Sequence, residues 1–155
     1  MKVLFICHAN ICRSFIAQEL LKKLRPDLEV FSRGLYADPS YVVPQKVHRF
    51  LTTCGITPPK HISTQLSAQD MEAADLVLLM ENQQLEHVLD AFAQHTDKCY
   101  LLLDFAYGQE KDLPDPVDLS GSAFTKQAEA LRAAVDACAK RITTKLPPQV
   151  APQNG

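Results

Sequence analysis

A cysteine and an arginine lie six residues apart near the start of the chain, in the segment Cys7-His-Ala-Asn-Ile-Cys-Arg-Ser14. A cysteine thiolate is a strong nucleophile, and Cys7 is the first candidate for that role. Arg13 carries a permanent charge and a planar fork that can bind two phosphate oxygens. Ser14 can donate a hydrogen bond to the thiolate. These residue types at this spacing predict a cysteine nucleophile at the floor of a phosphate-binding loop.

The chain around this segment predicts a strand before it and a helix after it. Residues 2–6 form an apolar run as long as one buried strand. Over residues 14–24 apolar side chains recur on one helical face, with Ser14 as the expected cap and Pro26 beyond the end. A turn between a strand and a helix directs backbone N–H groups and the helix N-terminus at one point. Amides placed to bind a phosphate there also stabilise a thiolate.

The rest of the chain alternates between expected strands and helices. Further strands are expected at residues 29–32, 76–80 and 100–103, and further helices at residues 44–54, 82–94 and 122–143, with Gly55 ending the first of these and a short helix beginning at Ser67. Because the strands are apolar, the pattern predicts a small doubly wound four-stranded parallel sheet with helices on both faces. We expect one domain over residues 1–145 and a mobile Pro- and Gln-rich tail over residues 146–155.

Composition excludes several classes of protein. The chain has 155 residues, 46% of them apolar and 22% charged, which argues against disorder. A net charge of −2 argues against a nucleic-acid partner, and the sequence has neither a membrane-spanning run nor a signal peptide. Five cysteines without zinc-finger spacing predict reduced thiols and no metal site. We therefore expect a cytoplasmic protein that needs no cofactor.

The loop resembles the signature Cys-x-Gly-Asn-x-Cys-Arg-Ser of the low-molecular-weight protein tyrosine phosphatases. The similarity extends over the chain up to the tail. The matching segments are Ser32-Arg33-Gly34, the stretch from Gly55 through His61 to Gln65, and Asp115-Pro116. The resemblance implies a four-stranded parallel α/β domain and a phosphomonoester hydrolase that acts on phosphotyrosine in proteins.

The resemblance also implies roles for single residues. Cys7 would take the phosphoryl group as a cysteinyl-phosphate, Arg13 would bind the phosphate, and Ser14 would assist the thiolate. Asn10 would hold the loop in shape with the help of Ser32 and His61. The loop residues expected to surround a phosphate or another oxyanion are His8, Ala9, Asn10, Ile11, Cys12 and Ser14, and Cys12 would also be able to form a reversible disulfide with Cys7.

Asp115 matches the family's general acid, which protonates the leaving oxygen and then activates water. The residues around it give independent support, because Pro114 and Pro116 stiffen the backbone on both sides. Asp112 and Asp118 are nearby rivals for the role.

Several positions depart from the family's pattern. Ala9 replaces a glycine, and a left-handed backbone there would cost about 1 kcal/mol. Phe15 replaces a proline, and Val117 replaces an aromatic residue that flanks the substrate ring. Tyr36 and Tyr41 are the candidates for another wall of the substrate pocket.

The sequence leaves four candidate functions for this chain. Protein tyrosine phosphatase leads, and protein arginine phosphatase is the alternative within the family. That branch has a threonine where this chain has Ile11, which favours phosphotyrosine. A thiol-linked arsenate reductase needs two further cysteines after the third strand, and residues 80–89 contain none. A weakly active or inactive phosphate-binding relative is suggested by Ala9 and opposed by the presence of both Cys7 and Asp115.

Overall fold

The computed structural model describes residues 1–143, so the predicted mobile tail and the last two residues of the predicted domain lie outside the described residues. The strands are β1 (Lys2–Cys7), β2 (Glu29–Gly34), β3 (Leu76–Leu79) and β4 (Cys99–Leu101). The helices are α1 (Arg13–Leu24), α2 (Gln45–Thr53), α3 (Ala68–Ala73), α4 (Asn82–Ala91), α5 (Leu102–Tyr107) and α6 (Gly121–Arg141), with a 3-10 helix at Ala93–Lys98. Within residues 1–143, none of the helices has the length and apolar character needed to cross a membrane.

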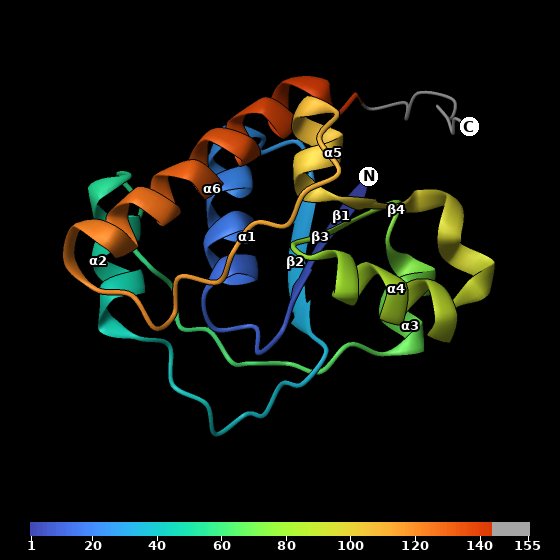
Figure 1. Ribbon diagram of the computed structural model, residues 1–155, viewed down its shortest axis with the longest axis horizontal. Helices are drawn as coiled ribbons and strands as arrows, with labels where there is room; N and C mark the ends of the chain where they lie inside the picture. Colours follow the sequence, from blue (N-terminus) through green and yellow to red (C-terminus); the bar gives the residue numbers. More distant parts are fainter. Residues whose placement is uncertain (144–155) are drawn as a thin grey trace.

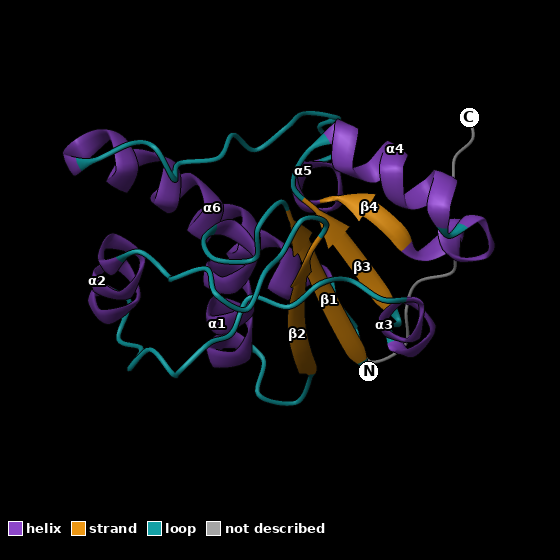
Figure 2. Ribbon diagram, turned by 90° about the horizontal axis from the view of Figure 1, so that it is seen from below, coloured by secondary structure: helices purple, strands orange, loops and turns teal. Residues whose placement is uncertain are grey.

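Figure 1 follows these elements along the chain. All strands pair in parallel, in the order β2-β1-β3-β4 (Figure 2). Figure 2 shows α1 and α6 on one side of the sheet and α3 and α4 on the other. The short helix α5 packs on α6, and α2 packs on α1. The predicted four-stranded parallel sheet with helices on both faces is confirmed.

The apolar strands serve two separate cores because successive side chains point to opposite faces. Val3 and Phe5 of β1 belong to the core under α1, α5 and α6. Leu4 and Ile6 belong to the core under α3 and α4. Burial on both faces explains why the strands are apolar throughout instead of alternating with polar residues.

The strand order places the predicted site at a topological switch point. The chain runs from β1 to β2 on one side and then crosses to β3 on the other side of β1. The loops that follow β1 and β3 therefore diverge and leave a crevice at the carboxyl ends of these strands. Cys7 ends β1, and Glu81 follows β3 at the start of α4.

The strand predicted at residues 100–103 is shorter than expected. β4 ends at Leu101, and the next residue already begins α5. Leu102, Phe105 and Ala106 recur at helical spacing and are buried in the core shared with α6. Gly108 ends this helix with a left-handed φ of 70°. The run of leucines fits both a strand and a helix, and packing against α6 favours the helix.

Several helix ends also differ from the expectations; α6, for example, ends at Arg141 and not at residue 143. Helix α1 begins at Arg13 with Cys12 as its N-cap residue and no side-chain cap, so Ser14 does not cap it. Helix α4 ends at Ala91 and not at residue 94. The C-terminal glycine of α2 is confirmed, since Gly55 has a left-handed φ of 80° after the helix.

Candidate active site

The loop that joins β1 to α1, residues 7–14, is the phosphate loop. Its backbone turns at Asn10, whose φ of 60° is the one left-handed value at a non-glycine residue within residues 1–143. Asparagine accepts this conformation more easily than most residues because its short polar side chain bonds locally. Ala9 stays outside the left-handed region, so the strain that a left-handed alanine would carry does not arise.

The buried side chain of Asn10 holds the phosphate loop in shape. Its amide nitrogen donates to the hydroxyl of Ser14 at 2.8 Å and to the hydroxyl of Ser32 at 2.9 Å. Its amide oxygen accepts from the backbone N–H of Thr64 at 3.0 Å. The three bonds tie the loop to α1, to β2 and to the segment before α3.

A directed chain of hydrogen bonds connects this network to the nucleophile. The Ser14 hydroxyl oxygen lies 2.9 Å from the sulfur of Cys7. Because Asn10 already donates to that oxygen, the Ser14 hydrogen is available to the sulfur. On the far side, the Ser32 hydroxyl donates to the side-chain oxygen of Gln18 at 2.7 Å. The buried chain therefore fixes the Ser14 hydroxyl beside the Cys7 sulfur.

His61 and Ser63 support the phosphate loop from outside. The Nε2 atom of His61 lies 2.8 Å from the carbonyl oxygen of Asn10, and the Ser63 hydroxyl donates to the carbonyl oxygen of Ala9 at 2.7 Å. The His61 ring stacks on Phe15 with 4.2 Å between centroids. Burial lowers the pKa of His61, which favours the neutral ring. Phe15, which stands where the family has a proline, thus packs against His61, and His61 supports the phosphate loop.

Gly34 at the end of β2 allows the phosphate loop to pass close behind it. A β-carbon at this position would lie 2.8 Å from the carbonyl oxygen of His8 and 3.1 Å from the carbonyl carbon of Ala9. The backbone N–H of Tyr36 donates to the same His8 oxygen at 2.8 Å. A side chain at Gly34 would therefore push the loop out of position.

Arg13 lies at the floor of the crevice with only 1% of its surface exposed. Its NH1 atom donates to the carboxylate of Glu81 at 2.5 Å and to the carbonyl oxygen of Leu113 at 2.8 Å. Its NH2 atom lies 3.4 Å from the carboxylate of Asp115. Within residues 1–143, the buried Nε atom has no hydrogen-bond partner. A buried donor of this kind is costly unless it binds something, and an oxyanion supplies the missing acceptor.

Asp115 reaches the crevice from the acid loop, residues 108–120, which joins α5 to α6. One carboxylate oxygen accepts from the backbone N–H of Val117 at 3.0 Å, and the other faces Arg13. Its side chain is 35% exposed, which leaves it accessible to a leaving group and to water. Of its rivals, Asp112 accepts from the backbone N–H that starts α4 at 2.7 Å. Asp118 is exposed. The geometry therefore favours Asp115 for proton transfer.

Cys12 is a buried neutral thiol. Burial first, and then the charges of Asp115 and Cys7, raise its pKa to about 12. A thiol that stays protonated is a poor nucleophile, so Cys12 does not compete with Cys7. Both cysteines are free in the structure, and their reversible disulfide stays a prediction.

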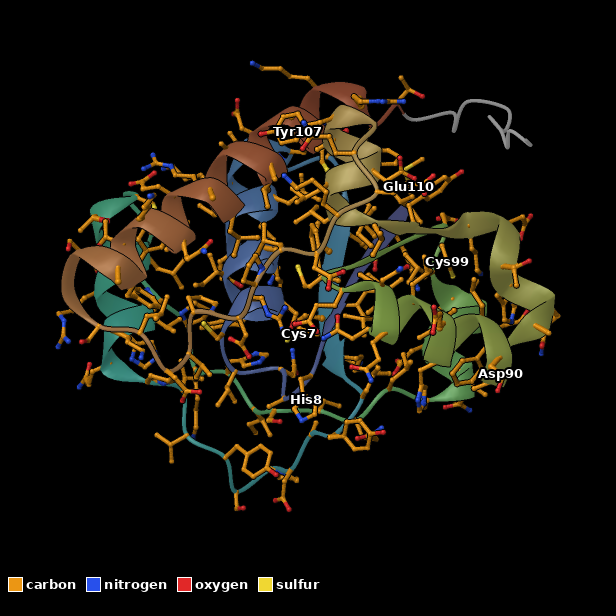
Figure 3. The ribbon with its side chains drawn as sticks, viewed as in Figure 1. Cys7, His8, Asp90, Cys99, Tyr107 and Glu110 are labelled. Carbon is orange, nitrogen blue, oxygen red and sulfur yellow. The ribbon has the colours of Figure 1, made fainter. Side chains whose placement is uncertain are left out.

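The crevice opens into a groove of about 1090 Å³ between the phosphate loop and α4. Three rings line it: His8 lies 4.9 Å from Tyr36, and Tyr36 lies 6.2 Å from His87, measured between ring centroids. Figure 3 shows Cys7 and His8 where the chain leaves β1, with Asp90 on α4. Arg13 and Asp115 line the same groove, as do Glu86 and Asp90. Tyr41 does not line this groove.

Some residues at the site were not foreseen from the sequence. Glu81 follows an apolar strand beside β1, so its place at the carboxyl edge of the sheet was a usable signal. Ser63 and Gln18 carry no such signal, because their contacts depend on how distant segments pack. Ile11, at the outer turn of the loop, is half-buried against the main core. Within residues 1–143, no group of His, Cys, Asp and Glu side chains is arranged to hold a metal ion.

Comparison with known proteins agrees with this geometry. Residues 2–147 match the family described as low molecular weight phosphotyrosine protein phosphatase. A low molecular weight protein-tyrosine-phosphatase of Acinetobacter johnsonii is 29% identical over 140 residues, which cover 90% of this chain and 96% of the relative. A protein-arginine-phosphatase of Bacillus subtilis is 28% identical over 146 residues, which cover 92% of this chain and 97% of the relative.

A solved structure extends the agreement to the fold. The crystal structure of a low molecular weight protein tyrosine phosphatase from T. tengcongensis has a TM-score of 0.86 with this chain at 27% identity. The similarity covers 92% of this chain and 99% of that one. The chain belongs to the low molecular weight phosphotyrosine protein phosphatase family and is a hydrolase of that class.

Proposed function

We propose that this protein removes phosphate from phosphotyrosine in proteins, with Cys7 as the nucleophile and Asp115 as the general acid. The observation that carries the proposal is the buried Nε atom of Arg13, which has no hydrogen-bond partner in the part of the chain that the structure describes. Glu81 and Leu113 hold the other end of the guanidinium, so the edge formed by Nε and NH2 is left for two phosphate oxygens. The N–H groups of the phosphate loop and of the N-terminus of α1 supply further donors.

The first step transfers the phosphoryl group to sulfur. The Cys7 thiolate attacks phosphorus, a sulfur–phosphorus bond forms, and the bond from phosphorus to the phenolic oxygen breaks. The protonated carboxyl of Asp115 gives its proton to that leaving oxygen. Arg13 stays bound to the equatorial oxygens, where negative charge accumulates in the transition state.

The second step releases phosphate. Asp115, now a carboxylate, takes a proton from water as the water oxygen attacks phosphorus. The sulfur–phosphorus bond breaks, and the Ser14 hydroxyl donates to the departing thiolate 2.9 Å away. The cycle restores the protonated Asp115 and the Cys7 thiolate.

The groove supports an aromatic leaving group. The rings of His8, Tyr36 and His87 stand beside the reacting residues, where the ring of a phosphotyrosine would extend. Tyr36 is 56% exposed, so its ring is available for stacking.

Protein arginine phosphatase is the second candidate, and a separate observation favours it. The carboxylates of Glu86 and Asp90 line the same groove and would attract a guanidinium leaving group. The Bacillus subtilis relative named for that activity is about as similar to this chain as the tyrosine phosphatase relative is.

The test begins with the hydrolysis of para-nitrophenyl phosphate near pH 6 with EDTA present, wild type beside Cys7→Ser. We expect turnover that resists the chelator and disappears in the variant. Turnover that persists in Cys7→Ser would remove Cys7 as the nucleophile. No turnover in a folded, reduced wild-type sample would favour a phosphate-binding relative.

Substrate choice is then measured on two peptides of one sequence that differ only in phosphotyrosine or phosphoarginine. We expect a higher kcat/KM for phosphotyrosine, and a loss of about tenfold in Tyr36→Ala from the removal of one stacking ring. Tyr41→Ala is the matched control, since Tyr41 is 46% exposed and lies outside the groove. A preference for phosphoarginine would reverse the order of the two candidates.

A further inference from the structure

The acid loop is held at two places, one on each side of Asp115. Before Asp115, the backbone N–H of Leu113 donates to the carbonyl oxygen of Met80 at 2.8 Å. The carbonyl oxygen of Leu113 accepts from Arg13 at 2.8 Å. These contacts join the first part of the loop to the residue that follows β3 and to the phosphate loop.

The part of the acid loop after Asp115 is held by a lysine from a distant helix. The ammonium group of Lys46, in the first turn of α2, donates to the carbonyl oxygen of Val117 and to that of Leu119, the latter at 2.6 Å. Within the described residues, these are the hydrogen bonds that reach residues 116–120 from outside the loop and α6.

Lys46 is itself held in place. It is half-buried, and its ammonium lies 5.3 Å from the centroid of the Phe124 ring, near the start of α6. Phe124 is buried and meets Phe50 of α2 edge to face, with 6.4 Å between ring centroids. The lysine thus joins α2, the acid loop and α6 at one point, and its charge is stabilised by two carbonyl dipoles and a ring face.

The contact at Val117 bears directly on the carboxyl group of Asp115. Val117 receives Lys46 through its carbonyl oxygen and donates through its N–H to the Asp115 carboxylate. That bond fixes one carboxylate oxygen and leaves the other toward Arg13. A second turn in the loop, from the N–H of Leu119 to the carbonyl oxygen of Pro116 at 2.9 Å, closes the same segment.

We propose that Lys46 is a positioning residue for the general acid: by binding the carbonyl oxygens of Val117 and Leu119 it places the Asp115 carboxyl group over the leaving oxygen. The inference rests on the proposed function. Lys46 does not touch the substrate, so it affects proton transfer and not phosphate binding.

The test compares Lys46→Met with wild type on para-nitrophenyl phosphate and on phenyl phosphate, whose phenol is the poorer leaving group. A general acid contributes about 10²–10⁴-fold to the rate, and we expect Lys46→Met to lose about tenfold more on phenyl phosphate than on para-nitrophenyl phosphate. The inhibition constant of inorganic phosphate should stay within about twofold, because Arg13 and the phosphate loop are unchanged.

Four further variants sharpen the result. Lys46→Arg keeps the charge and the donors and should recover most of the rate, and Lys46→Gln keeps donors in case the methionine variant fails to fold. Arg49→Met is the matched control, since Arg49 is an exposed cation one turn further along α2. In an Asp115→Asn background, Lys46→Met should lower the hydrolysis rate little further, because the carboxyl group that Lys46 positions is already gone.

Equal losses on both substrates, or losses that add fully to those of Asp115→Asn, would overturn the role of Lys46. Wild-type rates in Lys46→Met, together with Cys7-dependent turnover in the wild type, would overturn this inference and leave the proposed function standing. A wild type without Cys7-dependent turnover would overturn both.

Discussion

The phosphate loop and the acid loop meet at Arg13 but are built in opposite ways. In the phosphate loop Cys7, Asn10, Cys12 and Ser14 are buried. The side chains of Cys7, Asn10 and Ser14 form hydrogen bonds to one another, and Asn10 also bonds to Ser32 of β2. In the acid loop Asp112, Asp115 and Asp118 are exposed. The phosphate loop is therefore fixed by a buried hydrogen-bond network within it and around it, while the acid loop is fixed at two places by residues outside it.

The difference matches what each loop does in the proposed reaction. A phosphate must be bound by several donors at fixed distances, and fixed donors require a rigid, buried network. The general acid must meet a leaving group, release it and admit water, which needs an accessible side chain. Substitution of Asp115 in the acid loop should therefore change the rate alone, and substitution of a buried, hydrogen-bonded residue in the phosphate loop should change both rate and stability.

Asp115→Asn tests the expectation for the acid loop and has the largest expected effect. Because asparagine cannot donate the proton, we expect kcat on phenyl phosphate to fall by about 10²–10³-fold, with a smaller loss on para-nitrophenyl phosphate. The free energy of unfolding should change by no more than about 0.5 kcal/mol, since the side chain is largely exposed. Steady-state kinetics and urea unfolding measure the two quantities.

Asp118→Asn is the control for this substitution, because Asp118 is an exposed carboxylate in the same loop. It should match the wild type on both substrates. Losses of equal size on both substrates in Asp115→Asn, or the larger loss in Asp118→Asn, would show that the proton comes from another residue.

Asn10→Ala tests the expectation for the phosphate loop. It removes buried hydrogen bonds to Ser14 and Ser32, and we expect the free energy of unfolding to fall by about 2–3 kcal/mol. Turnover should fall by about tenfold or more, since the Ser14 hydroxyl loses the donor that orients it toward Cys7. Urea unfolding and kinetics on para-nitrophenyl phosphate measure both effects.

Asn10→Gly separates the side chain from the backbone at this position. Glycine loses the same side-chain bonds but accepts the φ of 60° without cost, whereas alanine pays about 1 kcal/mol more in a left-handed conformation. The glycine variant should therefore be the more stable of the two. Equal stabilities would mean that the loop changes its backbone when the asparagine is lost.

His61 should make the support of the phosphate loop depend on pH. Burial lowers its pKa from 6.5, so below about pH 6.5 the unfolded chain takes up a proton that the folded protein resists. The stability that comes from burying the neutral His61 ring is fully present above pH 6.5, and it is lost as the pH falls through the pKa of His61 in the folded protein. His61→Gln should lose less stability than wild type between pH 7 and pH 5.5, measured by urea unfolding across that range.

His48→Gln, on α2 and away from the phosphate loop, is the control. Its free energy of unfolding should change with pH as that of the wild type does. A wild-type slope in His61→Gln as well would mean that other groups cause the pH dependence.

The same contrast explains what the sequence could predict. The phosphate loop was predicted residue by residue because its parts lie within eight consecutive positions, between an apolar strand and an amphipathic helix. The sheet was predicted because strands buried on both faces leave long apolar runs. Asp115 was assigned from the match of Asp115-Pro116 to the family, and its flanking prolines gave further local support.

The residues that hold the acid loop could not be predicted in this way. Lys46 bonds to a loop 71 and 73 positions away in the sequence, and Arg13 bonds to Leu113 across 100 positions. Contacts of this kind follow from how α2, β3 and α6 pack, and no local pattern records them. The predicted end of β4 was wrong for the same reason, because packing against α6 favours the helical conformation of Leu102.

Ala9→Gly has the smallest expected effect and tests whether the phosphate loop of this chain needs the glycine of its relatives. The left-handed residue is Asn10 and not Ala9, so the methyl group of Ala9 causes no backbone strain. Glycine at this position should leave kcat/KM on para-nitrophenyl phosphate within about twofold, and should lower the free energy of unfolding by about 0.5–1 kcal/mol because it has more freedom when unfolded. Gly34→Ala is the contrasting variant, because its new methyl would lie 2.8 Å from the carbonyl oxygen of His8 and should impair both stability and turnover. A large gain of activity in Ala9→Gly would mean that the methyl group obstructs the bound phosphate, and would favour a weakly active phosphate-binding relative over an efficient phosphatase.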